Sequence, residues 1–411
     1  MSNYPSYSFP QPQQQPSLIF PPTYIAQPIP FNYPCPTTPS SSSGSSSSSG
    51  VNVNPRIPTI PPLEVKCDEN PLAPILHKHD DYLYVVTMIS NPVRFQRRLE
   101  LFNNFCKYMR SNPRVKLYAA ELQFGDRVYE TDAQLKLRTR CEMWHKENVL
   151  NLLIERLPET AKYIAWIDAD VEFKNPNWAE ETIHELQHYD IVQLFSQAID
   201  LGPKYNELIN VHTGFMYEYF KHGKTLPPVK TFQKKKKTGM MDYYGNVSSD
   251  TTVVVGGRYV GHPGYAFAIR KSALKNLGGL FDVSIIGSGD HIMCMAWVGE
   301  VERAIHHKAS ENFKMKAKIY QDRAETYIQR KIGYVPGILF HYWHGPKANR
   351  KYTDRWSILV DNHYEPDEDI KRDHQGLYLI DINKANRKAN IKLRDDLMTY
   401  FRIRNEDQNT E

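Results

Sequence analysis

Short apolar runs alternate with longer amphipathic segments between residues 82 and 200. The short runs have the length and the β-branched or aromatic content of buried strands, and the longer ones place apolar residues at helical spacing. We expect strands at 82–88, 115–120, 163–170 and 191–195, and helices at 95–109, 137–156 and 178–189. Strands and helices in this order predict parallel pairing in a doubly wound α/β sheet flanked by helices.

The pattern is less regular further along the chain. Residues 200–259 are rich in Gly, Lys and Tyr, which indicates an insertion or a long loop. A strand is expected at 264–270, followed by helices at 272–277, 292–298 and 313–330. The chain from residue 383 onward is basic and helical in pattern, with a charged end.

The first part of the chain differs in composition from the rest. Before Glu64 its only charged residue is Arg56, and from Ser40 to Ser49 only Gly44 interrupts a serine run. Such a segment has too little apolar surface and too many prolines to fold. We therefore predict a disordered Pro/Gln/Ser-rich tail at 1–76, an α/β domain at 77–382, and a basic C-terminal helix with a charged tail at 383–411.

Bulk properties exclude several classes of protein. The formal net charge is +5, and the lysine run at 234–237 lacks the interleaved aromatic residues of a nucleic-acid surface. The five cysteines form no CxxC pair, which argues against a disulfide framework or a zinc site. No run of about 18 apolar residues and no signal-peptide pattern is present, so we expect no transmembrane anchor and a cytoplasmic location.

The most informative motif is Asp168-Ala169-Asp170, directly after the apolar run that begins at Tyr163. Alternation along a strand sends Asp168 and Asp170 to the same side. Paired carboxylates at the end of a buried strand suit a divalent cation, although a polar turn is the simpler alternative. Ser90-Asn91 follows the first strand, and ligands of doubly wound sheets bind beyond such strand ends.

Four blocks together resemble the nucleotide-sugar glycosyltransferases of the GT-A class, most of all the β-1,4-galactosyltransferase and chondroitin-polymerase type. The blocks are Lys146–Asn151, Asp168–Asp170, Gly287–Ile292, and His344 with the later Arg355-Trp356 pair. The resemblance covers residues 82–359. Two features depart from the family: its acidic turn carries several consecutive acids where this chain has only Asp290, and its members are anchored in the Golgi membrane.

The resemblance implies a bound Mn²⁺ or Mg²⁺ ion. Asp170 and His344 would be direct ligands, with His341 as the rival histidine, and Asp168 would contact the ribose and reach the metal through water. Asp290 would be the general base that deprotonates the acceptor hydroxyl, which implies inversion at the anomeric carbon. The alternative for Asp290 is a helix N-cap.

The resemblance also places the donor nucleotide after the first strand. Candidate donor-binding residues are Thr87, Ser90, Asn91, Arg94, Arg138, Lys146, Asp168, Lys347 and Arg355. Asn91-Pro92 is equally consistent with a simple helix start, and charges on long helices are usually only solvated. The segment with Lys347, Arg350 and Arg355 is a candidate lid over the diphosphate.

These observations predict a metal-dependent glycosyltransferase that moves a sugar from a nucleotide donor, expected to be a UDP-sugar, to a hydroxyl of a glycan or protein acceptor. No nucleic-acid partner is expected. One alternative is a sugar nucleotidyltransferase, although Ser90-Asn91-Pro92 does not supply the Gly-rich basic loop of that class. The other is a nucleotide- or glycan-binding module without activity, against which the intact Asp168, Asp170, Asp290 and His344 argue.

Overall fold

The fold is known from a computed structural model that describes residues 81–226, 230–232, 254–256, 261–352, 354–382 and 387–409. The chain divides into residues 1–68 and 69–411, and everything described belongs to the second unit. The predicted N-terminal tail at 1–76 and the lysine run at 234–237 lie outside the described residues.

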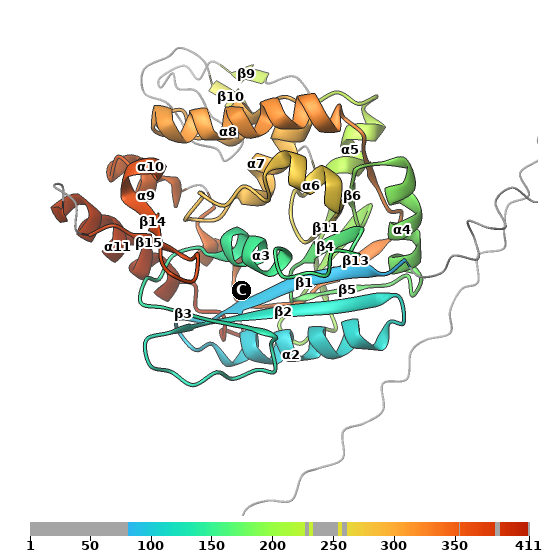
Figure 1. The fold of residues 1–411 in the computed structure, drawn as a ribbon, viewed down its shortest axis with the longest axis horizontal. Coiled ribbons are helices and arrows are strands. Elements are labelled where there is room, and N and C mark those ends of the chain that lie inside the picture. Colours follow the sequence, from blue (N-terminus) through green and yellow to red (C-terminus); the bar gives the residue numbers. More distant parts are fainter. Residues whose placement is uncertain are drawn as a thin grey trace, which may run out of the picture. The chain divides into compact units, whose positions relative to one another are not determined.

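A seven-stranded sheet forms the centre of the described part (Figure 1). Its order is β12 (Ile332–Tyr334), β6 (Ile191–Gln193), β11 (Ala266–Arg270), β4 (Tyr163–Ile167), β1 (Leu83–Ser90), β2 (Val115–Phe124) and β3 (Leu135–Thr139). Only β11 runs antiparallel to its two neighbours; the other pairs are parallel. The predicted α/β class with a mostly parallel sheet is confirmed.

Each face of the sheet carries its own hydrophobic core. In β4, Ile164 and Trp166 belong to one core, and Ala165 and Ile167 belong to the other. Because strand side chains alternate between faces, a continuous apolar run such as this fits a sheet that is covered on both sides. All four side chains are 2 % exposed or less.

Helices cover both faces (Figure 1). α2 (Gln96–Ser111) and α4 (Trp178–His188) pack into one core, while α3 (Lys146–Ile154), α6 (Lys271–Leu277), α7 (Gly289–Trp297) and α8 (Glu311–Arg323) pack into the other. Short helical turns occur at Val301–Ala304, Ala324–Ile328 and Lys347–Arg350, and α5 spans Phe215–Lys221. None of the helices in the described ranges is both long enough and apolar enough to span a bilayer.

A second, four-stranded sheet has the order β5 (Val171–Phe173), β13 (Ile338–His341), β7 (Gln197–Leu201) and β8 (Leu208–Thr213). β5 starts directly after Asp170, and β13 ends at His341, opposite Val171. This pairing brings the segment that carries His341 and His344 beside the Asp168–Asp170 turn. The sheet therefore positions one half of the candidate site.

The C-terminal region adds α9 (Trp356–Asp361), α10 (Pro366–Asp369), the hairpin β14 (Ile370–Arg372) and β15 (Tyr378–Ile380), and α11 (Arg387–Arg402). A further two-stranded pair joins β9 (Lys230–Phe232) and β10 (Val254–Gly256). The predicted C-terminal helix is thus present from Arg387.

Two predicted elements are wrong. The helix expected at 137–156 is the edge strand β3 followed by the shorter α3. Leu137 and Thr139 are buried while Lys136 is exposed, which is the two-residue period of a strand rather than that of a helix. The loop expected from residue 200 begins with β7, β8 and α5 instead, and much of the remainder, up to Tyr259, lies outside the described residues.

Candidate functional site

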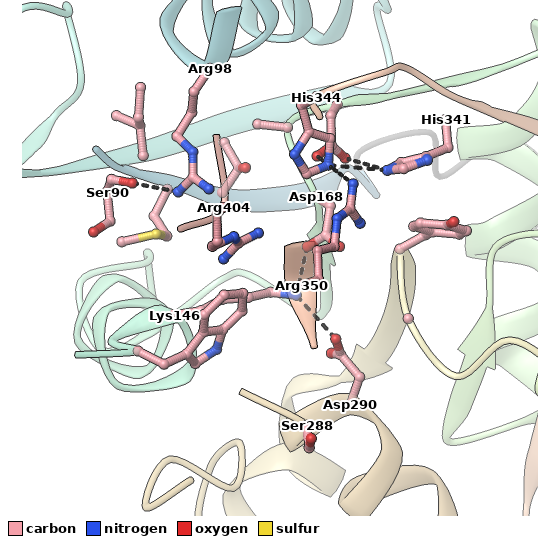
Figure 2. Close-up of a pocket in the computed structure, with 18 of the residues that line it drawn as sticks. Ser90, Arg98, Lys146, Asp168, Ser288, Asp290, His341, His344, Arg350 and Arg404 are labelled. Carbon is pink, nitrogen blue, oxygen red and sulfur yellow. Dashed lines mark hydrogen bonds and ion pairs between the residues drawn. The ribbon is translucent and has the colours of Figure 1, made fainter. Parts of the chain in front are cut away.

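A cavity of about 670 Å³ opens where the carboxyl ends of β1 and β4 meet the loops before β11 and after β13 (Figure 2). Ligands of parallel α/β sheets bind at this edge. All the side chains labelled in Figure 2 belong to its lining, and they come from segments that are far apart in the sequence.

Asp168 lies at the end of β4 and pairs with a lysine from the start of α3. Its Oδ1 is 2.6 Å from Lys146 Nζ, and the same Nζ is 3.3 Å from Asp290 Oδ2. Burial raises the pKa of Asp168 to about 6, although Lys146 opposes the shift. Burial alone would lower the pKa of Lys146, but the two carboxylates outweigh it and raise that pKa. One largely buried cation therefore pairs with two acids of the cavity.

Asp170 has different partners from Asp168. Its Oδ2 lies 2.9 Å from His344 Nε2, and its Oδ1 lies 3.9 Å from His341 Nε2. The two imidazole Nε2 atoms are 3.3 Å apart. One ligand atom from each of these three residues fits within a span of 4.8 Å. The structure thus brings both candidate histidines to Asp170.

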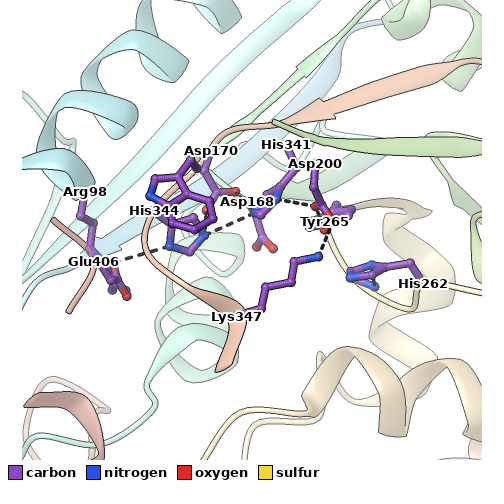
Figure 3. Close-up of polar contacts among 12 residues, drawn as sticks. Arg98, Asp168, Asp170, Asp200, His262, Tyr265, His341, His344, Lys347 and Glu406 are labelled. Atoms are coloured by element: carbon purple, nitrogen blue, oxygen red, sulfur yellow. Dashed lines mark hydrogen bonds and ion pairs between the residues drawn. The ribbon is translucent and has the colours of Figure 1, made fainter. Parts of the chain in front are cut away.

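Hydrogen-bond partners assign the tautomer of His341 (Figure 3). Nε2 of His344 lies between a donor, Arg350 Nη2 at 2.8 Å, and an acceptor, Asp170 Oδ2 at 2.9 Å. The Asp200 carboxylate lies 2.8 Å from His341 Nδ1, so that nitrogen carries the proton. Burial lowers the pKa of His341 to about 4, which keeps its ring neutral near pH 7. The Nε2 atom of His341 therefore carries a lone pair, and it lies 3.3 Å from Nε2 of His344.

These residues fit a divalent cation. The Oδ1 atom of Asp170 is buried and has no hydrogen-bond partner among the described residues. A carboxylate oxygen and two imidazole nitrogens are a donor set that Mn²⁺ and related divalent metals accept. A cation between them would satisfy the orphaned oxygen.

Asp200 in β7 contacts His341 at Nδ1, the ring nitrogen that does not face Asp170. Besides His341 it accepts hydrogen bonds from Tyr265 Oη at 2.9 Å and His212 Nε2 at 2.5 Å, and it pairs with Lys347. Burial raises the pKa of Asp200, but hydrogen bonds from His212 and His341 hold it well below its usual range. An ionised carboxylate of this kind fixes ring orientation and raises the basicity of the ligand nitrogen.

Glu406, in the tail after α11, supports the other histidine (Figure 3). Its side chain is 1 % exposed, and its Oε2 lies 3.6 Å from His344 Nδ1. Arg98 and Arg404 also pair with it, the latter at 3.0 Å. Burial raises the pKa of Glu406, but Arg98 and Arg404 outweigh it and hold that pKa well below its usual value.

Asp290 is the second residue of α7 and does not cap that helix. The N-cap position belongs to Ser288, and no side-chain cap bond is present. Ser288 has a φ of 72°, and its Oγ accepts a 2.6 Å hydrogen bond from Arg355. Gly289 is required here, because a Cβ on it would lie 2.7 Å from Glu147 Oε1. The turn leaves the Asp290 carboxylate facing Lys146 and the cavity.

The structure brings most of the sequence-predicted residues to the cavity. Those that line it are Thr87, Ser90, Lys146, Asp168, Asp170, Asp290, His344, Lys347 and Arg355. Three others do not. Asn91 bonds to the backbone of Phe95, Arg94 is exposed, and Arg138 bonds to the carbonyls of Gly125 and Arg127.

Sequence reasoning missed several residues of this region. They are Arg98, Asp200, His262, Tyr265, Arg404 and Glu406. The rings of His262 and Tyr265 stack at 3.9 Å, and Tyr265 stacks on His341 at 4.6 Å. The Gly264-Tyr265 strand start was visible in the sequence, but no local pattern marks the acids in β7 or in the C-terminal tail.

Comparison with known proteins finds partial matches among solved structures. No family model matches the sequence, and no curated protein matches it. One of the solved structures is the catalytic domain of Drosophila β1,4-galactosyltransferase 7 in complex with xylobiose, with 12 % identity and a TM-score of 0.26 over 52 % of this chain and 59 % of that one. Another is 4-diphosphocytidyl-2C-methyl-D-erythritol synthase from Anaerococcus prevotii DSM 20548, with 10 % identity and a TM-score of 0.26 over 62 % of this chain and 89 % of that one. A third is a proposed nucleotide-diphospho-sugar transferase from Desulfovibrio desulfuricans G20 (9 %, 0.25, 68 % and 94 %).

Proposed function

We propose that this protein is a metal-dependent glycosyltransferase that moves a sugar from a nucleoside-diphosphate donor, UDP-linked in the first instance, to a hydroxyl of a glycan or protein acceptor. The observation that carries the proposal is that Asp170, His341 and His344 form a metal-type cluster in the same cavity as Asp290. A cation site and a carboxylate base in one cavity are what transfer to a hydroxyl requires.

The metal would be held by Asp170, His341 and His344. Bound there, Mn²⁺ or Mg²⁺ would act as a Lewis acid that neutralises charge on a leaving diphosphate. Asp200 and Glu406 orient the two histidines through their Nδ1 atoms. Asp168 would contact the ribose of the donor and reach the metal through water, as the resemblance implies.

Positive side chains around the cluster would bind the donor's phosphates. Lys347, Arg350 and Arg355 all line the cavity and come from one segment after β13. Arg350 lies directly beside the cluster through its contact with His344. Because phosphate oxygens accept charge-assisted hydrogen bonds, this segment is well placed to hold a diphosphate as sugar transfer proceeds.

Asp290 would accept the proton of the attacking hydroxyl. Lys146 holds its carboxylate at the cavity wall, and Lys146 also pairs with Asp168, which fixes the base relative to the donor side. Attack assisted by a carboxylate on the face opposite the leaving group inverts the anomeric centre. The role of Asp290 and the stereochemical outcome are both proposals that the geometry permits.

The test is a panel of nucleotide sugars incubated with the full chain and Mn²⁺, with release of free nucleoside diphosphate as the readout. Asp170→Asn is the inactive comparison, and Asp361→Asn, which changes an exposed carboxylate at the end of α9, is the control. A sugar nucleotidyltransferase would instead release pyrophosphate from a nucleoside triphosphate and a sugar phosphate. A binding module would bind a nucleotide and release neither product, which would refute the proposal.

A further inference from the structure

Arg404, the second residue after α11, is a buried cation with unused hydrogen-bonding capacity. Its side chain is 6 % exposed and lines the cavity. The Nε atom lies 3.0 Å from Glu406 Oε1, whereas Nη1 is buried and donates to no atom in the described ranges of the chain. A buried polar group without a partner is costly, so an unfilled donor on a cavity wall points to a ligand.

The charges around Arg404 point the same way. The guanidinium groups of Arg98 and Arg404 line this corner of the cavity, and both pair with the Glu406 carboxylate. Burial lowers the pKa of Arg404, Glu406 opposes the shift, and the charges of Arg98 and Arg350 lower the pKa further. The corner therefore carries more positive than negative charge.

This corner is separate from the metal cluster. Glu406 faces Nδ1 of His344, while the cluster forms at Nε2 on the other side of the same ring. Arg404 lies beyond Glu406, and its guanidinium stands 5.7 Å from the ring of Trp144. In Figure 2, Arg404 and Arg98 lie near Ser90 at one end of the cavity, and His341 lies toward the other.

We propose that Arg404, with Arg98 beside it, binds an oxyanion: a phosphate, sulfate or carboxylate group. A planar guanidinium with free N–H groups matches such an anion in shape and charge. Given the proposed function, on which this identification of the ligand rests, the anion belongs to the donor sugar or to the acceptor and is additional to the diphosphate at the metal. The substrates of this protein would thus include an acidic or phosphorylated sugar.

The anion site is tested first without metal. The melting temperature of the full chain is measured in EDTA with sulfate or phosphate and, at equal ionic strength, with chloride. We expect sulfate and phosphate to raise it in the wild type, and Arg404→Met to lose at least half of that rise. Arg402→Met is the matched control, because Arg402 is half-exposed two residues earlier and pairs with Glu142. The proposed anion site would be refuted if the melting temperature of the wild type were the same in chloride and in sulfate. It would also be refuted if sulfate raised the melting temperatures of the wild type and Arg404→Met equally.

Arg404→Lys keeps the proposal testable even where Arg404→Met does not fold. It retains the charge but not the planar fork, so it should keep part of the sulfate response and lose the rest. A full wild-type response in Arg404→Lys would show that the guanidinium is not what binds the anion.

A second experiment identifies the source of the anion. With Mn²⁺ present, binding of UDP-glucuronate and UDP-glucose is compared in wild type and Arg404→Met. A preference for the acidic donor that Arg404→Met abolishes assigns the anion to the donor. Inhibition by sugar phosphates or sugar sulfates in wild type but not in Arg404→Met assigns the anion to the acceptor. If neither the donor preference nor this inhibition is observed, the assignment of the anion to a substrate is overturned. Failure of the proposed function would appear differently, as absence of Mn²⁺-dependent UDP binding in the wild type.

Discussion

The Nε2 atoms of His341 and His344 lie 3.3 Å apart, and both face the Asp170 carboxylate. Asp200 lies against Nδ1 of His341, so Nε2 of that ring carries the lone pair. The buried Oδ1 of Asp170 has no hydrogen-bond partner among the described residues, and a cation between it and the two rings would satisfy it. We therefore expect both rings to act as metal ligands rather than as packing histidines.

The first prediction is that both histidines bind Mn²⁺. Mn²⁺ at about 100 times its Kd should raise the free energy of unfolding of the wild type by ~2.7 kcal/mol. His341→Ala and His344→Ala should each lose most of that gain, because each removes a direct ligand. Calorimetric titration with Mn²⁺ and thermal unfolding in Mn²⁺ or EDTA measure the two effects. His374→Ala, at an exposed position between β14 and β15, is the control. Wild-type Mn²⁺ affinity in either variant would remove that histidine from the site.

The second prediction concerns Glu406, which contacts His344 Nδ1 from the C-terminal tail. Glu406→Gln keeps the shape but removes the charge that orients the ring. Loss of such an outer carboxylate typically weakens metal binding by about 10- to 100-fold. We expect a Mn²⁺ affinity reduced by that order in calorimetry. Asp407→Asn is the control, since Asp407 holds the same tail to the backbone of α2 without touching His344. Equal affinity in both variants would show that Glu406 serves the tail alone.

The sequence predicted the half of the site that depends on local pattern. The apolar run at Tyr163 predicted β4 because a strand buried on both faces must be apolar throughout. Asp168 and Asp170 were predicted to share one side, yet the turn after β4 gives them different partners, Lys146 and His344. These different partners result from the shape of the turn, which the alternation of side chains along a strand does not predict.

The other half depends on contacts between distant segments. Glu406 reaches Arg98 across 308 positions of the chain, and Asp200 reaches His341 across 141. No periodicity links such pairs, so a buried acid in the tail looks the same in sequence as a solvated one. The edge strand β3 was mistaken for a helix for a related reason. Leu137 fits the apolar spacing of a helix as well as that of a strand, and only its pairing with Leu122 in β2 distinguishes the two.

The third prediction is that Asp290 acts on the acceptor. Asp290→Asn preserves the shape of the side chain, and Ser288 rather than Asp290 occupies the N-cap, so folding should be little affected. Transfer should fall by ~10²- to 10⁴-fold, the usual contribution of a general base. Affinity for UDP with Mn²⁺ should stay near that of wild type. The transfer rate is measured as an initial rate with a donor that the wild type uses, and the affinity for UDP is measured by calorimetry. Asp361→Asn controls for the change in charge. Turnover close to wild type would assign the base to another group.

The last prediction uses Glu147, which is buried beneath the turn that carries Asp290 and accepts a 2.9 Å hydrogen bond from Trp144 Nε1. Burial raises its pKa from 4.5 to about 8, with Asp290 adding to the shift and Lys146 opposing it. Between these pH values the unfolded chain releases the proton and the folded chain keeps it. The contribution of Glu147 to stability therefore falls as pH rises through this window.

Glu147→Gln removes this dependence, because the amide stays neutral and its oxygen still accepts from Trp144. Relative to wild type, the variant should gain stability steadily between pH 5 and pH 8. Denaturant unfolding of both proteins at several pH values measures the difference in the free energy of unfolding. Glu155→Gln, an exposed glutamate just after α3, should show no such trend. A difference between Glu147→Gln and wild type that stays constant from pH 5 to pH 8 would mean that Glu147 is already ionised in the folded protein, with Lys146 rather than burial controlling its charge.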